Sequence, residues 1–161
     1  MISLEEARDL VSLTSRLIHS FTVSSLMGRL AELLDADTEM WMLVGVLHDL
    51  DYDDTVDDRS RHGVLTADRL IGLLPEEGLK AILCHDHRTG LKPESDLDFA
   101  LILCDAISSV IEAGRIEFPV EISLFYDCLE MLSEDKPWIR DRINQNPILL
   151  KIELQDLLET Q

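Results

Sequence analysis

Two apolar runs that contain isolated ionisable residues dominate the hydrophobic pattern of this chain. The first run, MWMLVGVLHDL at residues 40–50, ends in a His-Asp pair. The second run, FALILCDAISSVI at residues 99–111, contains one charge, Asp105. Both runs are shorter than the roughly 18 apolar residues that a membrane span needs, so we expect them to form buried core helices. His19 also stands among apolar residues, in a stretch with helical spacing.

The polar positions between the apolar ones predict an all-α fold. Ser3, Thr38, Ser60 and Ser95 are candidate N-cap residues, because their hydroxyl oxygens can accept hydrogen bonds from the free backbone N–H groups of a first helical turn. The predicted helices begin at Ser3 and then span about residues 15–34, 38–48, 60–74, 75–85, 95–114, 119–132, 137–143 and 147–158. No repeat, strand-like alternation or long linker separates them, so we expect one domain over residues 1–161.

Composition and charge narrow the classes of function. Hydrophobic residues make up 46% of the 161 residues, enough for a sizeable core, and the formal net charge is −18. This acidic surface argues against general nucleic-acid binding, although metals and a few arginines can still attract a small phosphorylated metabolite. The first ten residues, MISLEEARDL, contain no basic signal region. We expect a cytoplasmic protein without membrane association, and a homodimer is left open.

Three cysteines, Cys84, Cys104 and Cys128, lie in apolar helical patterns. Their number is odd and none belongs to a CxxC motif, so we expect them to be reduced core thiols.

The isolated charges in apolar segments indicate a metal centre. A buried carboxylate is costly unless it is paired or binds a metal. The candidate ligands on apolar helical segments are His19, His48, Asp49 and Asp105. Imidazole and carboxylate donors together suit a divalent transition metal, Mn, Fe, Co, Ni or Zn, better than Ca or Mg alone.

Further motifs extend this set. The chain contains HDLDY at 48–52, His62-Gly63, AILCH at 81–85 and CDAISSVIEA at 104–113. In their order these motifs resemble the small HD hydrolases of the HD-domain superfamily, which are mostly metal-dependent phosphohydrolases. The resemblance covers about residues 17–113. It implies a compact helical bundle, on which we expect the carboxy-terminal helices of residues 119–159 to pack.

The resemblance also implies a set of metal ligands. The first metal would be held by His19, His48, Asp49 and Asp105. His62 and His85 are candidates for a second metal that Asp49 bridges, although solvated histidines are also ordinary at helix ends. The sequence DHRTGLKPE after His85 lacks the Gly-Tyr-Pro motif of cyclic dinucleotide phosphodiesterases, which argues against that activity.

The implied activity is hydrolysis of a phosphate ester in a small metabolite, a nucleotide or a related phosphomonoester, by a metal-activated water. Asp49 would hold the metals and accept a proton. Asp51 would orient a metal ligand or a water, and the alternative is that it belongs to a solvated acidic loop. His87 is expected to be exposed or to contact the substrate.

Arginines are the candidate phosphate clamps, because a guanidinium can donate two parallel hydrogen bonds to a phosphate. Arg88, with Arg59 and Arg61, flanks the predicted centre in the sequence. The alternative for Arg88 is a surface ion pair with Asp86 or Glu94.

Two other functions fit the same residues. Some HD-fold enzymes hold two irons with a similar six-ligand set and activate oxygen, so a di-iron oxygenase is the first alternative. A non-catalytic sensor or binding module that keeps its metal for structure is the second.

Overall fold

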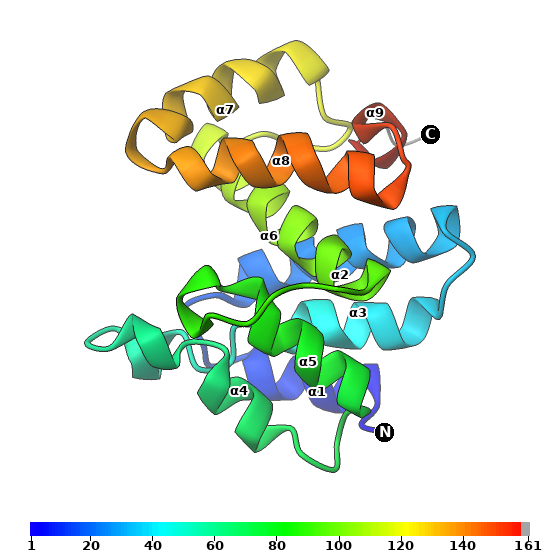
Figure 1. The fold of residues 1–161 in the computed structure, drawn as a ribbon, viewed down its shortest axis with the longest axis vertical. Helices are drawn as coiled ribbons and strands as arrows, with labels where there is room; N and C mark the ends of the chain where they lie inside the picture. Colours follow the sequence, from blue (N-terminus) through cyan, green and yellow to red (C-terminus); the bar gives the residue numbers. More distant parts are fainter. Residues whose placement is uncertain (159–161) are drawn as a thin grey trace.

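The computed structural model describes residues 1–158 (Figure 1). Within that range it contains nine α-helices, three short 3₁₀ helices and no strand, which confirms the predicted all-α class. The α-helices are α1 (Leu4–Val11), α2 (Leu17–Leu33), α3 (Thr38–Leu47), α4 (Val64–Arg69), α5 (Glu76–His85), α6 (Asp96–Gly114), α7 (Ile122–Asp135), α8 (Pro137–Leu150) and α9 (Leu154–Leu158). The 3₁₀ helices are η1 (Asp53–Thr55), η2 (Arg59–Arg61) and η3 (His87–Thr89).

Helix α6 is the central helix of the bundle. Ser95 caps its N-terminus, as predicted, and Asp98 completes a capping box. Most of its apolar side chains are buried, because α6 contacts α2, α3, α5, α7 and α8. In Figure 1, α6 runs between the α7–α8 pair and the group formed by α2, α3 and α5. A polar side chain on α6 is therefore brought close to side chains from several other helices.

Helices α2 and α3 approach each other closely at Gly45. A Cβ atom at this position would lie only 2.9 Å from the Cα atom of Ser24 on α2. The missing side chain therefore allows the two backbones to come together. This close packing brings His19 on α2 near His48, which is the C-cap residue of α3.

Two predicted helix starts are wrong. Asp37, rather than Thr38, caps α3 through its side chain. Ser60 lies within η2, whose cap is a preceding aspartate, and α4 begins only after Gly63. Gly63 has φ +79°, a conformation that a residue with a side chain rarely adopts. His62 is consequently held in an extended turn before α4 and not in the helix that was predicted.

The carboxy-terminal helices also break at unpredicted places. Pro119 precedes α7 by several residues, because Glu121 is the N-cap. Pro147 was expected to begin the last helix, but it lies inside α8, which continues to Leu150. Packing of α8 on α6 and α7 outweighs the loss of one backbone hydrogen bond at the proline. Residue 159, the predicted end of this region, lies outside the described residues.

Residues 1–158 bear on the expectations about membrane spans and cysteines, and they also include both tryptophans. In this range no helix is long and apolar enough to cross a membrane. The three cysteines are buried and free. Trp41 is buried, whereas the side chain of Trp138 on α8 remains 42% exposed.

Candidate metal centre

The structure brings all six predicted ligands into one cluster. They are His19 in α2, His48 and Asp49 after α3, His62 before α4, His85 at the end of α5, and Asp105 in the middle of α6. Asp105 is partly exposed and the other five are buried. Residues far apart in the sequence thus meet because α2, α3, α5 and α6 pack together.

The carboxylate of Asp49 stands at the centre of this cluster. Its Oδ1 lies 3.3 Å from Nε2 of His48, 3.1 Å from Nε2 of His62 and 3.7 Å from Nε2 of His85. Its Oδ2 lies 3.6 Å from Nε2 of His19. One oxygen therefore faces three imidazoles and the other faces the fourth. A carboxylate placed between two groups of ligands in this way can bridge two metal ions.

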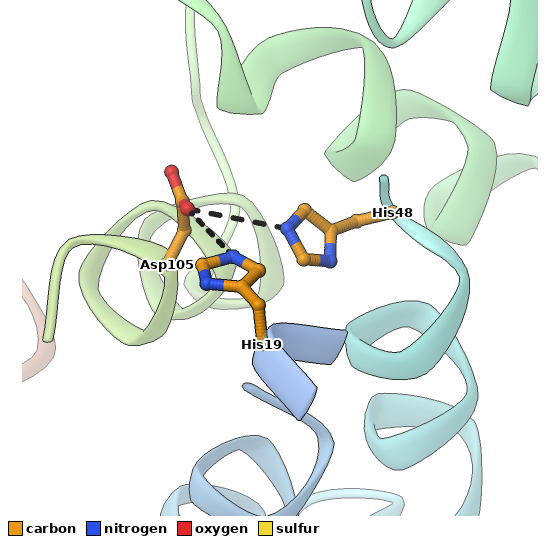
Figure 2. Close-up of side chains that lie close together, drawn as sticks. All are labelled: His19, His48 and Asp105. Atoms are coloured by element: carbon orange, nitrogen blue, oxygen red, sulfur yellow. Dashed lines mark ion pairs between the residues drawn. The ribbon is translucent and has the colours of Figure 1, made fainter. Parts of the chain in front are cut away.

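Asp105 approaches the same imidazoles from α6. Figure 2 shows its carboxylate pointing toward the rings of His19 and His48, at 3.2 Å and 4.0 Å between Oδ1 and the Nε2 atoms. Two sets of three residues could each hold a metal ion, because the donor atoms within each set lie within 4.8 Å of one another. One set is His19, His48 and Asp105, and the other is His48, Asp49 and His85. His48 belongs to both sets, so the sets are less separate than the motif order implied.

The Nδ1 atoms of all four histidines have polar partners. Nδ1 of His48 lies 2.8 Å from the carbonyl oxygen of Gly45, and Nδ1 of His85 lies 2.6 Å from that of Ile82. A carbonyl oxygen only accepts hydrogen bonds, so Nδ1 must carry the proton in both rings. In the neutral ring, Nε2 then keeps a free lone pair, and Nε2 is therefore the atom that can bind a metal. Backbone geometry therefore orients these two rings as ligands.

The buried Nε2 atoms provide a direct test of whether a metal fits. Among the described residues, neither Nε2 of His19 nor Nε2 of His48 has a hydrogen-bond partner. Nε2 of His19 is near Asp105, but that contact lacks hydrogen-bond geometry. Buried polar atoms without partners are rare and require an explanation. A divalent transition metal satisfies both nitrogens and both carboxylates, so the residues present fit such an ion.

The pKa values of His19, His48, Asp49 and His62 are strongly shifted from their usual values. Burial lowers the pKa of His48 to about 4, so this ring is neutral near pH 7. Burial acts in the same direction on His19 and His62, but nearby carboxylates outweigh it and raise both pKa values to about 9. Burial raises the pKa of Asp49, but the surrounding histidines hold it well below its usual range. Without a metal, the ionised carboxylate is thus balanced by protonated imidazoles.

Asp51 contacts His62 at Nδ1, the ring nitrogen that does not face Asp49. Its Oδ1 lies 2.7 Å from Nδ1 of His62, and its Oδ2 accepts a hydrogen bond from the backbone N–H of Thr66 at 3.0 Å. Asp51 is fully buried and does not line the cavity at the cluster. Its contacts are those of a residue that fixes a ligand ring, rather than of a residue that touches a substrate.

Two arginines that sequence reasoning missed contact the central carboxylates. Nε of Arg16 lies 3.1 Å from Oδ2 of Asp49, and the guanidinium stacks 4.8 Å from the ring centre of Tyr52. Nη1 of Arg142 on α8 donates to Oδ2 of Asp105 at 3.0 Å, and its Nη2 donates to the carbonyl oxygen of His85 at 2.9 Å. The position of Arg16, three residues before His19, was the one signal available in the sequence.

The predicted arginine clamp is assembled only in part. Arg88 lines the cavity beside the cluster, but its guanidinium is bound to Asp86, which is the ion pair that the alternative described. Arg59 lies over the ring of Tyr52 and donates to its carbonyl oxygen, and Arg61 is exposed. Neither Arg59 nor Arg61 lines the cavity.

Comparison with known proteins agrees with this arrangement. The family model described as "HD domain" matches residues 16–109, which include all six clustered residues and Arg16. The chain therefore belongs to the HD domain family. The match ends before α7, so the last three helices lie outside the matched region.

One curated relative is Ribonuclease Y from Protochlamydia amoebophila (strain UWE25). It is 37% identical over 101 residues, which represent 62% of this chain and 19% of that protein. The chain thus spans only about a fifth of the length of this relative. No solved structure gave a significant match.

Proposed function

We propose that the chain is a metal-dependent phosphohydrolase that acts on a small phosphate ester, a nucleotide or a related phosphomonoester. The observation that carries this proposal is the pair of buried Nε2 atoms on His19 and His48 that lack hydrogen-bond partners among the described residues and face the Asp49 and Asp105 carboxylates. Membership of a family whose members are mostly metal-dependent phosphohydrolases supports the same reaction class.

The residues that would hold metal are the six of the cluster, and the Asp49 carboxylate is the one that faces all four histidines. When bound there, a divalent transition metal would lower the pKa of a water molecule toward neutrality and so supply a nucleophile for a phosphoryl group. The low pKa of Asp49 keeps its carboxylate ionised, so it can ligate a metal. The same low pKa makes this carboxylate a weak proton acceptor. Asp51 holds the ring of His62 so that its Nε2 faces Asp49.

Arg16 is the best placed cation for a phosphoryl oxygen. It lines the cavity at the cluster and is held by Asp49, by Glu112 at 3.3 Å and by the face of Tyr52. These three contacts fix the guanidinium before a substrate arrives, and a fixed charge stabilises developing negative charge better than a mobile one. Arg142 acts indirectly, because both of its contacts are to residues of the cluster.

The size of the cavity and the charge of the chain favour a small substrate. The cavity has a volume of about 440 Å³, within the usual range for small-molecule sites. The net charge of −18 disfavours a polynucleotide. The relative is named a ribonuclease, but this chain covers only 19% of that protein. Cleavage of RNA is therefore the result that would contradict the proposed substrate size.

The test measures phosphate release from a panel of nucleotides and sugar phosphates. The protein is stripped with EDTA and then supplied with Mn, Co, Ni, Fe or Zn. We expect activity with at least one metal and none with EDTA. Asp49→Asn should abolish this activity, whereas Asp57→Asn, which alters an exposed carboxylate of the acidic loop, should retain it. Absence of phosphate release with every metal and ester, or equal activity of both variants, would contradict the proposal.

The di-iron oxygenase remains the second candidate, because the cluster contains the six ligands on which that alternative rests. Metal analysis and an oxygen electrode separate the two. Iron pairs with substrate-dependent oxygen uptake would favour the oxygenase, and oxygen-independent phosphate release would exclude it.

A further inference from the structure

The cavity at the metal centre has two unlike sides. One side carries the cluster residues and Arg16. The other side is built by α7 and α8, which follow the region matched by the family model. The cavity residues from this hairpin and its junction are Leu132, Lys136, Trp138, Ile139 and Arg142. The HD region thus supplies the residues of the proposed chemistry, and the carboxy-terminal hairpin supplies other residues of the cavity lining.

Trp138 is the unusual residue on this second side. Its side chain is 42% exposed although it is the largest apolar group that lines the cavity. Its ring centre lies 6.0 Å from that of His87, and the rings are tilted by 48°. Trp41, the other tryptophan, is buried in the core. A partly exposed indole on the wall of a polar cavity offers a flat face on which a planar group can stack.

The charges around the cavity favour an anionic ligand. Four carboxylates line it together with four Arg and Lys side chains, in a chain whose net charge is −18. Arg16, Arg88 and Arg142 are each bound to a carboxylate. Lys136 is exposed and forms no ion pair within the described part of the chain, so it can pair with a ligand. Divalent metals in the cluster would then make the whole cavity positive.

We propose that the α7–α8 hairpin determines specificity by stacking the aromatic part of the substrate on Trp138, while its phosphate lies at the Asp49 cluster. The ligand class is a phosphate monoester whose organic part contains a planar aromatic ring. This inference rests on the proposed phosphohydrolase function, which it deepens by naming the substrate class and the residue that selects it.

The first experiment compares AMP, which contains an aromatic base, with ribose 5-phosphate, which does not. The kcat/KM of each is measured for the metal-loaded wild type, Trp138→Ala and Trp138→Phe. Tyr126→Ala is the matched control, because this aromatic residue on α7 is 44% exposed and does not line the cavity. Stacking of a base on an aromatic side chain is worth about 1–3 kcal/mol. The preference for AMP should therefore fall roughly 5- to 160-fold in Trp138→Ala, mainly through KM.

Trp138→Phe should keep most of the preference for AMP, since it retains an aromatic face, and Tyr126→Ala should keep all of it. A wild type that shows no preference for AMP would overturn the inference. An equal preference in wild type and Trp138→Ala would also overturn it, and both results would leave the phosphohydrolase function standing. Circular dichroism of each variant establishes that a lost preference does not come from a lost fold.

The second experiment does not depend on turnover. Tryptophan fluorescence is titrated with the methylene phosphonate analogue of AMP, whose carbon–phosphorus bond resists hydrolysis. We expect quenching in the wild type and a loss of most of it in Trp138→Phe, where only the buried Trp41 remains. If neither ester is hydrolysed with any metal, the phosphohydrolase function fails for this substrate class and the titration decides alone. Quenching that needs Trp138 would support the aromatic site, and its absence would overturn it.

Discussion

Arg142 connects the carboxy-terminal hairpin to the metal centre, and its removal gives the sharpest test of that connection. The side chain donates one hydrogen bond to Oδ2 of Asp105 and another to the carbonyl oxygen of His85. Oδ1 of Asp105, the other oxygen, faces His19. Arg142 therefore fixes the orientation of one candidate ligand and the end of the helix that carries another. We predict that Arg142→Ala weakens metal binding without removing any ligand.

The expected size of the effect follows from these contacts. Loss of a residue that holds a metal ligand in place typically weakens metal affinity by about 10- to 100-fold, or about 1.4–2.8 kcal/mol. The side chains of Arg142 and Asp105 are each only 16% exposed, so solvent screens their ion pair weakly. In the metal-free protein, loss of this charged hydrogen bond should cost about 1.5–3 kcal/mol of unfolding free energy. Arg142→Lys should have a metal affinity and a stability between those of the wild type and Arg142→Ala, because a single ammonium group replaces a guanidinium that donates to two acceptors.

The assay is a competition titration of metal against a coloured chelator, together with urea unfolding in EDTA. Arg140→Ala is the matched control, since Arg140 lies on the same helix and pairs with the exposed Glu130 instead of the cluster. The control should match the wild type in both measurements within about twofold in affinity and 0.5 kcal/mol in stability, as is usual for surface changes. Equal metal affinity for Arg142→Ala and Arg140→Ala would refute the proposed role of Arg142.

Three further predictions concern the surroundings of the cluster. Gly63→Ala should lose at least about 1 kcal/mol more unfolding free energy in urea than Gly72→Ala. Both glycines have positive φ, but a Cβ atom at Gly63 would lie 2.9 Å from a carbonyl oxygen of α5. A Cβ atom at Gly72 would have no described atom within 4 Å. Equal losses of stability in the two variants would contradict this prediction. Metal binding at pH 7.5 should release protons, because His19 and His62 have pKa values of about 9 and must lose a proton to become ligands. Calorimetry in buffers of different ionisation enthalpy detects this release, and the metal affinity should rise with pH. Metal uptake without proton release would be inconsistent with ligation by these rings. Arg88→Ala should lower kcat/KM on the best ester by less than about threefold, because Asp86, which is not one of the six cluster residues, holds its guanidinium, whereas Asp49 holds Arg16 at the cluster itself. A loss of tenfold or more would show that Arg88 acts as a phosphate clamp.

Much of the fold could be predicted because the deciding signals are local. The capping boxes at Ser3 and Ser95 and the apolar run of residues 99–111 each fix a helix through neighbours a few positions away. The errors occurred where packing outweighs a local signal. Pro147 is tolerated inside α8 because the helix packs on α6 and α7, and Ser60 does not begin a helix because the chain turns at Gly63.

The candidate site was predictable to a different extent. Isolated polar residues in apolar segments predicted His19, His48, Asp49 and Asp105, because burial without a partner is costly. His62 and His85 were predicted from the resemblance to the HD family, and all six candidates meet in space. The arginine contacts could not be derived in the same way. Arg16 and Arg142 pair with carboxylates 33 and 37 positions away, and an arginine at or within a helix has the same sequence pattern whether it faces solvent or a cavity.

The central claim is that the cluster around Asp49 holds a divalent transition metal, and metal content tests it most directly. Elemental analysis is carried out after metal loading and gel filtration on the wild type, His48→Gln and His87→Gln. His87 is the matched control, because its side chain is 62% exposed and lies outside the cluster. We predict at least one metal per chain in the wild type and His87→Gln, and a loss of most of it in His48→Gln. Equal metal content in all three proteins, or no metal in the wild type, would contradict the account.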